Sequence, residues 1–390
     1  MLKVNSPYTQ EQIGEYPLVP MKSIEGIIQT AYSLFEDRSQ WLKPHERKTI
    51  LQRCARIMES RIEELTKLAA NEGGKPLNDS KVEVLRAING VEIAAENIAE
   101  LKGGEIPMGL TSASEGRVAF TQREPIGVVA SVSAFNHPLN LIIHQVVTAV
   151  AAGCPVIVKP APTTPMSCEA LVGILKEAGL PEGWCQMVIC ENDVAERLIT
   201  DTRINYFSFI GSAKVGWYLR SKLSAGTRCA LEHGGAAPVI VEPDADFEEM
   251  IPSLIKGGFY HAGQVCVSVQ RVFAHKSICK KLAQEIASGA QKLKVGDPLD
   301  ASTEVGPLIL PREVDRVEEW VNEAVEAGAE VLCGGRRISA TCFEPTVLFN
   351  PPATVRVSTS EIFGPVVCIY SYTDRAEAIE TANSLDVHFQ

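Results

Sequence analysis

Hydrophobic positions recur every three or four residues between Ser23 and about Leu101, which is the spacing of one face of an α-helix. The clearest stretch is "ERKTILQRCARIMESRIEELTKLAANEGGKP", where Gly73, Gly74 and Pro76 end the pattern. This part of the chain is therefore predicted to be helical.

The hydrophobic period then changes. Residues 116–135, "GRVAFTQREPIGVVASVSAF", predict a strand, a kink at Pro125 and Gly127, and a second strand. Short β-rich runs such as "PVIVKP", "CQMVIC", "INYFSFI", "RCALEH" and "APVIVEP" follow, and most are separated by helical patterns. This alternation predicts an α/β fold with a largely parallel sheet that helices cover on both faces.

A second α/β series begins near Asp244, and the change of series places a domain boundary near 235–245. A chain of 390 residues is also long enough for two or three domains. The second series is predicted to contain helices over 246–261, 277–292 and 312–327 and strands at "QRVFAH", "AEVLCGG" and "PVVCIYSY".

Charge and cysteine usage narrow the class of protein. The formal net charge of −11 opposes binding to nucleic acid or to an anionic membrane surface. No stretch approaches the ~20 apolar residues of a membrane span, and the first residues do not resemble a signal peptide. Eleven scattered cysteines without a CxxC pair indicate reduced thiols, with no disulfide framework and no metal site. A cytoplasmic protein is expected.

The segment "HAGQVCVSV" (261–269) contains a cysteine with two possible roles. Cys266 is either a core thiol, as most cysteines among small and β-branched residues are, or a nucleophile. The histidines His233 and His261 would also be compatible with a Cys–His hydrolase. The sequence lacks a G-x-S-x-G nucleophile elbow, which argues against that class of enzyme.

Other candidates lie at or near predicted strand ends, where α/β sheets bind ligands. Each has an ordinary alternative role as a solvated side chain, a turn residue or a helix cap. Nothing matches the GxGxxG fingerprint in a strand–turn–helix context. The candidates are Asn136 in "SAFNHPLN", Lys159 in "VIVKPAPTTP", Gly211, Ser212 and Gly216 in "FSFIGSAKVG", and Glu232 in "LEHGGAAPVIV".

Six motifs follow one another in a characteristic order: "FNHP", "VIVKPAPTTP", "FSFIGSAKVG", "LEHGGAAP", "GQVCVSVQR" and "EIFGPVV". From about residue 25 onward this series resembles the aldehyde dehydrogenase superfamily. The resemblance implies two parallel-sheet α/β domains with a small β arm used for assembly into a homodimer or homotetramer. The cofactor-binding domain would comprise 1–104 and 126–234, the oligomerisation arm 105–125, and the catalytic domain 235–390.

The resemblance also implies roles in the oxidation of a small aldehyde to its carboxylic acid. Cys266 would attack the aldehyde carbon, Asn136 and the backbone N–H of Cys266 would stabilise the oxyanion, and Glu232 would activate the water that hydrolyses the thioester. Two alternatives stay open: a CoA-acylating relative, against which Glu232 argues, and a catalytically silent protein with a binding or structural role.

The resemblance implies a cofactor site for NAD or NADP. Lys159 would contact the adenosine ribose, Ser212 the pyrophosphate and Glu361 the nicotinamide ribose, with Phe363 beside that ribose. Pro162 stands where many NAD-preferring relatives carry a glutamate, so a 2′-phosphate meets no carboxylate there and both cofactors are expected to work.

Two departures from the family pattern bear on substrate and completeness. Phe135-Asn136-His137 replaces a common Trp-Asn-Phe or Trp-Asn-Tyr, as in some succinate-semialdehyde, lactaldehyde and phosphonoacetaldehyde dehydrogenase-like members. A small, polar or acidic aldehyde is therefore expected. The sequence also ends at "NSLDVHFQ", where relatives continue, so the C-terminal part of the catalytic domain is expected to be absent.

Overall fold

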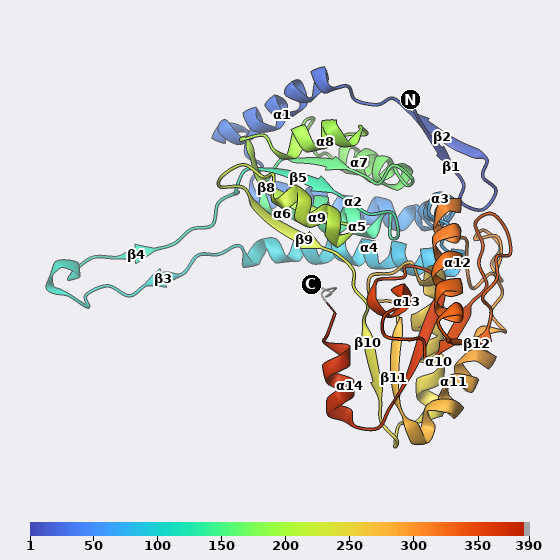
Figure 1. Cartoon of the computed structure of the whole chain (residues 1–390). Helices are drawn as coiled ribbons and strands as arrows, with labels where there is room; N and C mark the ends of the chain where they lie inside the picture. The colour runs from blue at the N-terminus through green and yellow to red at the C-terminus, as the bar shows by residue number, and fades with distance from the viewer. Residues whose placement is uncertain (386–390) are drawn as a thin grey trace.

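The computed structural model describes residues 1–385 and contains two five-stranded sheets that follow one another along the chain (Figure 1). The expectation about the end of the chain concerns residues outside this range. The first sheet is entirely parallel, as the alternation of strands and helices predicts. Its strands lie in the order β7 (Cys185–Met187), β6 (Val156–Lys159), β5 (Val128–Val132), β8 (Ile204–Ile210) and β9 (Arg228–Glu232).

Helices cover both faces of this sheet. Side chains alternate along a strand, so Val129 and Val158 pack on one face while Ala130 and Ile157 pack on the other. The first face lies under α2 (Pro44–Ser60), α3 (Ile62–Gly73), α4 (Leu77–Asn97) and α7 (Met166–Glu177), and the second under α1 (Met21–Glu36) and α8 (Asn192–Ile199).

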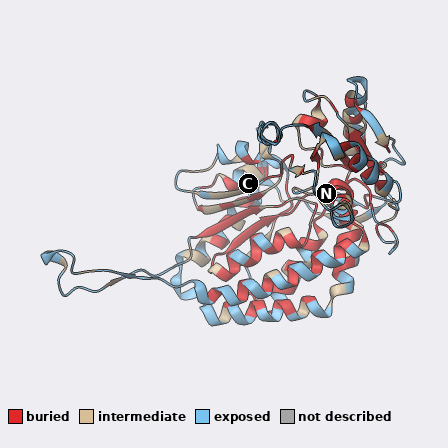
Figure 2. Cartoon of the chain, turned by 90° about the horizontal axis from the view of Figure 1, so that it is seen from below, coloured by how far each residue is buried: buried red, intermediate tan, exposed pale blue. Residues whose placement is uncertain are grey.

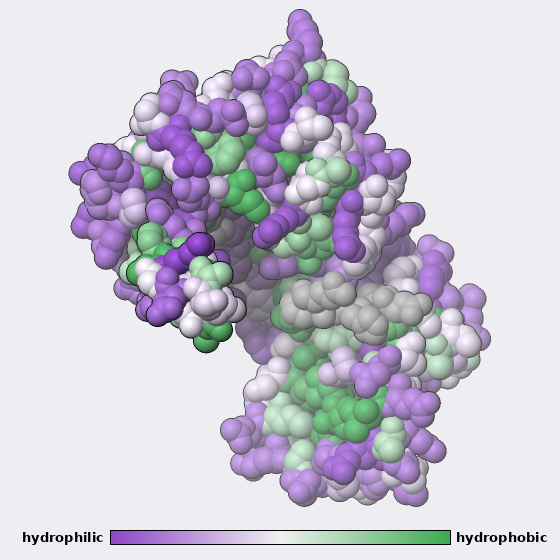
Figure 3. Space-filling view, turned by 90° about the vertical axis from the view of Figure 1, so that its left-hand side faces the viewer, coloured by the Kyte–Doolittle hydropathy of each residue, from purple (hydrophilic) through white to green (hydrophobic). Residues whose placement is uncertain are grey.

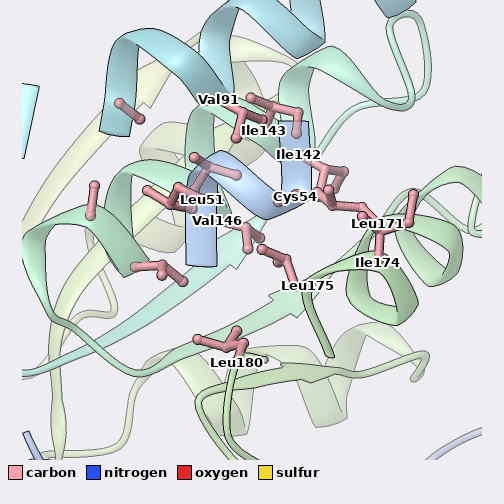
Figure 4. Packing of buried hydrophobic residues seen from close by; sticks show 14 of the residues in the cluster. Leu51, Cys54, Val91, Ile142, Ile143, Val146, Leu171, Ile174, Leu175 and Leu180 are labelled. Carbon is pink, nitrogen blue, oxygen red and sulfur yellow. The ribbon is translucent and has the colours of Figure 1, made fainter. Parts of the chain in front are cut away.

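The hydrophobic positions that predicted the helices form the core on the first face. Figure 4 shows Leu51 and Cys54 of α2, Val91 of α4 and Leu171 of α7 gathered in one cluster, with Val91 beside Ile143. Figure 2 shows the same arrangement by burial, with a buried sheet and helices whose outer faces are exposed. Burial of each such side chain contributes roughly 1.5–3 kcal/mol, which makes this core the main stabilising element of the first half.

The second sheet is parallel except at one edge. There the strands β13 (Thr346–Phe349) and β12 (Glu330–Cys333) pair antiparallel. No helix intervenes between these two strands, so the chain can turn back directly. The strands are β10 (Pro238–Val241), β11 (Arg271–His275), β14 (Val366–Tyr372), β13 (Thr346–Phe349) and β12 (Glu330–Cys333), with helices α10 (Phe247–Phe259), α11 (Lys276–Ala290), α12 (Pro311–Glu326), α13 (Arg356–Thr359) and α14 (Arg375–Ala382).

The predicted elements are present with ends shifted by one or two residues in most cases, and several further elements were not predicted. The strand β13 and the helix α14 belong to this group, and α14 contains Ile379 as its single large hydrophobic residue, which gives no hydrophobic period. The helical segment after Asn136 is interrupted by a π-helical stretch. The helix α9 (Ala213–Arg220) is one of the helices predicted between the strands of the first sheet. The remaining elements are β1 (Leu2–Asn5), β2 (Gln12–Tyr16), α5 (Asn140–Ile142), the π-helical η4 (Ile143–Val147), α6 (Thr148–Ala152) and the short helices η1 (Arg38–Gln40), η2 (Ile98–Glu100), η3 (Ser112–Ser114) and η5 (Tyr260–Gly263).

A two-stranded arm projects from the body of the molecule (Figure 1). Its strands, β3 (Glu105–Ile106) and β4 (Ala119–Phe120), pair antiparallel. Large hydrophobic side chains along the arm are exposed, including Leu110, Val118 and Phe120.

None of the helices within residues 1–385 combines the length and apolar character that crossing a membrane requires.

A fully buried ion pair joins the start of α4 to the segment after Asn136. Lys75 donates to the Glu83 carboxylate, and both side chains are completely excluded from solvent. The other carboxylate oxygen of Glu83 accepts hydrogen bonds from the backbone N–H groups of Leu139 (2.9 Å) and Asn140 (3.0 Å). Glu83 thus caps the first turn of α5 and fixes the loop that carries Asn136.

Replacing Lys75 by methionine should destabilise the fold strongly, because the Glu83 carboxylate would stay buried without a counter-charge. We expect the free energy of unfolding to fall by ~3 kcal/mol, measured by urea unfolding monitored by circular dichroism. Lys81→Met, at a lysine on α4, is the matched control. Its ion pair with Glu63 is solvent-exposed, so its loss should be far smaller. Equal losses for the two variants would contradict this role of the buried pair.

Candidate functional site

A cleft of about 550 Å³ lies at the carboxyl ends of the first-sheet strands. It is lined from one side by the segments that follow β5, β6, β8 and β9, and from the other by α12 and two loops of the second half. Of the ten residues predicted from the sequence, nine line this cleft: Asn136, Lys159, Pro162, Gly211, Ser212, Glu232, Cys266, Glu361 and Phe363.

The cleft coincides with the point where the order of strands reverses. After β5 the chain continues to β6 and β7 on one side, and then crosses to β8 and β9 on the other. The crossovers leave a crevice beyond the carboxyl ends of β5 and β8, which is where open parallel sheets bind nucleotide ligands. Ser133 follows β5 at this point, and Gly211 and Ser212 follow β8.

Cys266 is half-buried and, among the eleven cysteines, is the only one that lines the cleft. It lies in an irregular loop after three consecutive residues with left-handed backbone, His261 (φ 49°), Ala262 (φ 53°) and Gly263 (φ 70°). At Gly263 a Cβ atom would lie 2.0 Å from the carbonyl oxygen of Gly364, so only glycine fits. This close approach places the Cys266 loop against the loop that carries Glu361.

Asn136 is buried, and its amide lies beside the Cys266 loop. Its Nδ2 donates to the backbone carbonyl of Gln264 at 3.0 Å. An amide nitrogen has two hydrogens, so the second remains available to a ligand in the cleft. Beside it, the rings of Phe135 and Phe363 meet edge to face, with centroids 5.7 Å apart.

Glu361 is a carboxyl group largely withdrawn from water. Burial raises its pKa to about 7, and the nearby Arg316 opposes this shift. Its Oε1 is buried and, among the residues that the structure describes, accepts no hydrogen bond. Gly234 lies directly against it, since a Cβ there would be 1.8 Å from Oε1. Such an unpartnered acceptor indicates a place for a ligand hydroxyl.

The electrostatic environment of Cys266 favours the neutral thiol. Burial raises the pKa of the thiol, and the carboxylates of Glu361 and Glu232 raise it further. Glu232 itself is exposed at the end of β9, with its backbone carbonyl held by the N–H of Gly211 (3.0 Å). The cleft therefore combines one thiol with three carboxylates in different environments: Glu361 is withdrawn from water, Glu232 is exposed, and Glu313 is paired with Arg316.

The cationic groups of the cleft lie at two separate positions. Lys159 ends β6 and is mostly buried, and this burial lowers its pKa. Arg316 on α12 pairs with Glu313 (2.9 Å) and lies over the ring of Trp320. Ser212 occupies the N-cap of α9, where free backbone N–H groups attract anions.

The lining of the cleft differs from the prediction in two ways: one candidate lies outside it, and other residues line it that were not candidates. Gly216 does not line the cleft: it lies within α9, where a Cβ atom would be 3.0 Å from the ring of Phe209. Its small size serves helix-to-sheet packing. Further residues line the cleft that were not among the ten candidates. Three of them, Glu313, Arg316 and Trp320, recur at the i, i+3, i+7 spacing of one face of α12, and others include His137 and Gln264.

Comparison with known proteins identifies the family. The aldehyde dehydrogenase family model matches residues 1–388. The 3-sulfolactaldehyde dehydrogenase of Priestia aryabhattai is 37% identical over 391 residues, covering 100% of this chain and 81% of that protein.

Solved structures agree. Glyceraldehyde-3-phosphate dehydrogenase GapN from Methanocaldococcus jannaschii, complexed with NADP, matches with a TM-score of 0.93 at 34% identity, covering 99% of this chain and 83% of that one. Betaine aldehyde dehydrogenase from Staphylococcus aureus, in complex with NAD+, matches with a TM-score of 0.93 at 28% identity, covering 98% and 77%.

Removing the charge of Glu361 should make Cys266 more reactive. In Glu361→Gln the negative charge that raises the thiol pKa is gone, so the pKa falls and the thiolate fraction at a given pH rises. We expect alkylation of Cys266 by iodoacetamide at about pH 8 to accelerate about two- to fivefold, measured by mass spectrometry of its peptide. Glu313→Gln is the control, because that cleft carboxylate is paired with Arg316. An unchanged alkylation rate in Glu361→Gln would contradict this coupling.

Proposed function

The chain belongs to the aldehyde dehydrogenase family and oxidises small aldehydes with NAD or NADP, and we propose that Cys266, Asn136 and Glu232 carry out this reaction. The observation that supports these roles is that all three side chains, far apart in sequence, line one cleft at the carboxyl ends of a parallel sheet. A core thiol would not meet an amide donor and a carboxylate in a shared cavity.

The first step is attack of the Cys266 thiolate on the aldehyde carbon. A carbon–sulfur bond forms, and the carbonyl oxygen becomes an oxyanion. The free amide hydrogen of Asn136 and the backbone N–H of Cys266 donate to that oxygen, which stabilises the charge as it develops. Because burial and the two carboxylates raise the pKa of the thiol, the thiol must first lose its proton to water before the thiolate attacks.

Glu232 is suited to the second half of the reaction. When bound, the cofactor supplies the acceptor for the hydride that the former aldehyde carbon loses, which leaves a thioester on Cys266. The exposed carboxylate of Glu232 can take a proton from a water molecule and later release it to solvent. The hydroxide formed then attacks the thioester carbon, and the carbon–sulfur bond breaks to leave a carboxylate product and the free thiol of Cys266.

The residues of the cleft fit a nicotinamide dinucleotide. Lys159 would hold the adenosine ribose, and the segment of Gly211 and Ser212 at the start of α9 would accommodate the pyrophosphate. The unpartnered Oε1 of Glu361 would accept from the nicotinamide ribose, beside Phe363. Pro162 adds no carboxylate near Lys159, which supports use of both NAD and NADP.

The substrate proposed is a small aldehyde that carries an acidic group. Two of the similar proteins act, by their names, on 3-sulfolactaldehyde and on glyceraldehyde-3-phosphate, which are both anionic. His137, directly after Asn136, adds an imidazole ring to the cleft where the family commonly has phenylalanine or tyrosine.

A reducing compartment such as the cytoplasm is proposed from the thiols. All eleven cysteines fall within residues 1–385, and each is free. Eight of the eleven are buried, so their thiols pack as small hydrophobic groups. Recovery of the native protein with an intramolecular disulfide would contradict this assignment.

The catalytic roles can be tested with three variants and a panel of small acidic aldehydes. Cys266→Ala should abolish reduction of NAD and of NADP, whereas Asn136→Ala should lower kcat by ~100- to 1,000-fold because one oxyanion donor is lost. Cys229→Ala, at a half-buried cysteine outside the cleft, is the matched control and should keep its activity.

The same assay tests the cofactor and the second substrate. Wild-type protein should reduce both cofactors, and a several-hundredfold preference for NAD would contradict the argument from Pro162. Carboxylic acid should form without CoA. Acyl-CoA formation that requires added CoA would instead assign the chain to the CoA-acylating reaction and overturn the role of Glu232.

We also propose a homodimer or homotetramer. Figure 3 shows the molecule from the side on which the arm projects, where a broad hydrophobic area lies on the part built around the second sheet. On the same side the arm exposes Leu110 and Phe120, and exposed hydrophobic surface of this extent is typical of association. Leu110→Glu with Phe120→Glu should shift sedimentation toward monomer, while Glu115→Gln should not. A wild-type monomer at every concentration would contradict the proposal.

A further inference from the structure

The loop that carries Cys266 has little regular structure of its own. Between η5 and β11, residues 264–270 form neither a helix nor a strand. A loop whose backbone is not held by a ladder of hydrogen bonds depends on side chains for its position. Two glutamines, Gln264 and Gln270, stand at its two ends, and both are almost completely buried.

Gln264 satisfies three backbone groups with its side-chain amide. Nε2 donates to the carbonyls of His261 and Pro307 (both 3.2 Å), and Oε1 accepts from the N–H of Ile309 (2.9 Å). Its own backbone carbonyl is the acceptor for the amide of Asn136. The side chain therefore fixes the carbonyl to which the proposed oxyanion donor is anchored.

Gln270 makes the equivalent set of contacts around Glu361. Its Nε2 donates to the carbonyls of Ser360 (2.7 Å) and Val357 (3.2 Å), and its Oε1 accepts from the N–H of Ile362 (2.8 Å). Ser360 and Ile362 are the two neighbours of Glu361. One amide thus bonds the backbone on both sides of that carboxylate, as an adjacent strand would.

We propose that Gln264 and Gln270 are positioning residues with separate tasks, Gln264 holding Asn136 in register with Cys266 and Gln270 holding Glu361 in register with the cofactor. This inference rests on the proposed roles of Asn136 and Glu361. Neither side chain transfers a proton or a hydride. Each acts through the backbone of the residue that it fixes.

Separate tasks produce separate kinetic effects. If Gln270 places Glu361, its loss weakens cofactor binding and leaves the chemical step nearly intact once cofactor is saturating. If Gln264 places Asn136, its loss slows the chemical step and leaves cofactor binding nearly intact. Two glutamines that only stabilise the fold would lower both quantities together.

The test compares Gln264→Leu with Gln270→Leu, which remove the amides at similar volume. Cofactor Kd is measured by calorimetry and kcat by nicotinamide absorbance at saturating cofactor. For Gln270→Leu we expect Kd to rise about tenfold with kcat changed less than about threefold. For Gln264→Leu we expect kcat to fall about tenfold with Kd changed less than about threefold. Parallel changes in Kd and kcat within each variant would overturn the proposal.

A double-mutant cycle tests whether Gln270 acts through Glu361. In a Glu361→Ala background, adding Gln270→Leu should change Kd less than about twofold, because the group that Gln270 places is already gone. An undiminished tenfold effect, or a Glu361→Ala variant with wild-type Kd, would overturn the task assigned to Gln270. Absence of aldehyde oxidation by wild-type protein with intact cofactor binding would instead contradict the proposed function.

Gln270→Glu keeps the test decisive if the leucine variant folds poorly. An ionised carboxylate can accept from Ile362 but cannot donate to Ser360, whereas the protonated form can do both. Burial raises the pKa of such a carboxyl group. The ratio of variant to wild-type Kd should therefore fall as the pH is lowered from about 8 to about 6, and a constant ratio would overturn the hydrogen-bonding role.

Discussion

The arrangement of the cleft depends on one close contact between two stretches of backbone. Gly263 lies against the carbonyl of Gly364 with no room for a side chain, and its backbone is left-handed. This contact brings together the loop of Cys266 and the loop of Glu361, which are about a hundred residues apart in sequence. Any residue other than glycine at 263 would push the two loops apart, and the thiol would lose its place relative to the strand ends of the first sheet.

The contact also brings charged groups close to the Cys266 thiol, and these groups affect the pKa values of one another. Glu361 is withdrawn from water and has a pKa of about 7, so its charge changes within the physiological range of pH. Together with Glu232 it raises the pKa of the Cys266 thiol, so the free protein holds its nucleophile in the less reactive, neutral form. Arg316 acts in the opposite direction on Glu361. Entry of a ligand that contacts Glu361 or Arg316 would alter this balance, which links the reactivity of the thiol to occupation of the cleft.

The sequence predicts the fold well where the hydrophobic period is long. The helices of the first half and the parallel strands follow from patterns of ten residues or more, or from repeated alternation. Helix α14 was not predicted because Ile379 is its single large hydrophobic residue, and strand β13 was also missed. The π-helical segment η4 shares the pattern of an ordinary helix. The domain limits and the individual roles of the candidate residues remain proposals. Nine of the ten candidates share the cleft because each belongs to a motif at a strand end or a loop, whereas Gly216 belongs to the helix that follows.

The two positioning glutamines differ in physical kind from the candidates that the sequence identified. A candidate nucleophile is recognised by its own chemistry, but Gln264 and Gln270 have no reactive group, and their effect lies in the backbone atoms that their side chains bind. Neutral amides also suit their place near Cys266, because they satisfy backbone groups without adding a charge that would shift the thiol pKa. An ion pair serves the same purpose at Lys75 and Glu83, where each charge compensates the other. The chain thus fixes the surroundings of Asn136 with charges that cancel, and the loop of the thiol with groups that carry none.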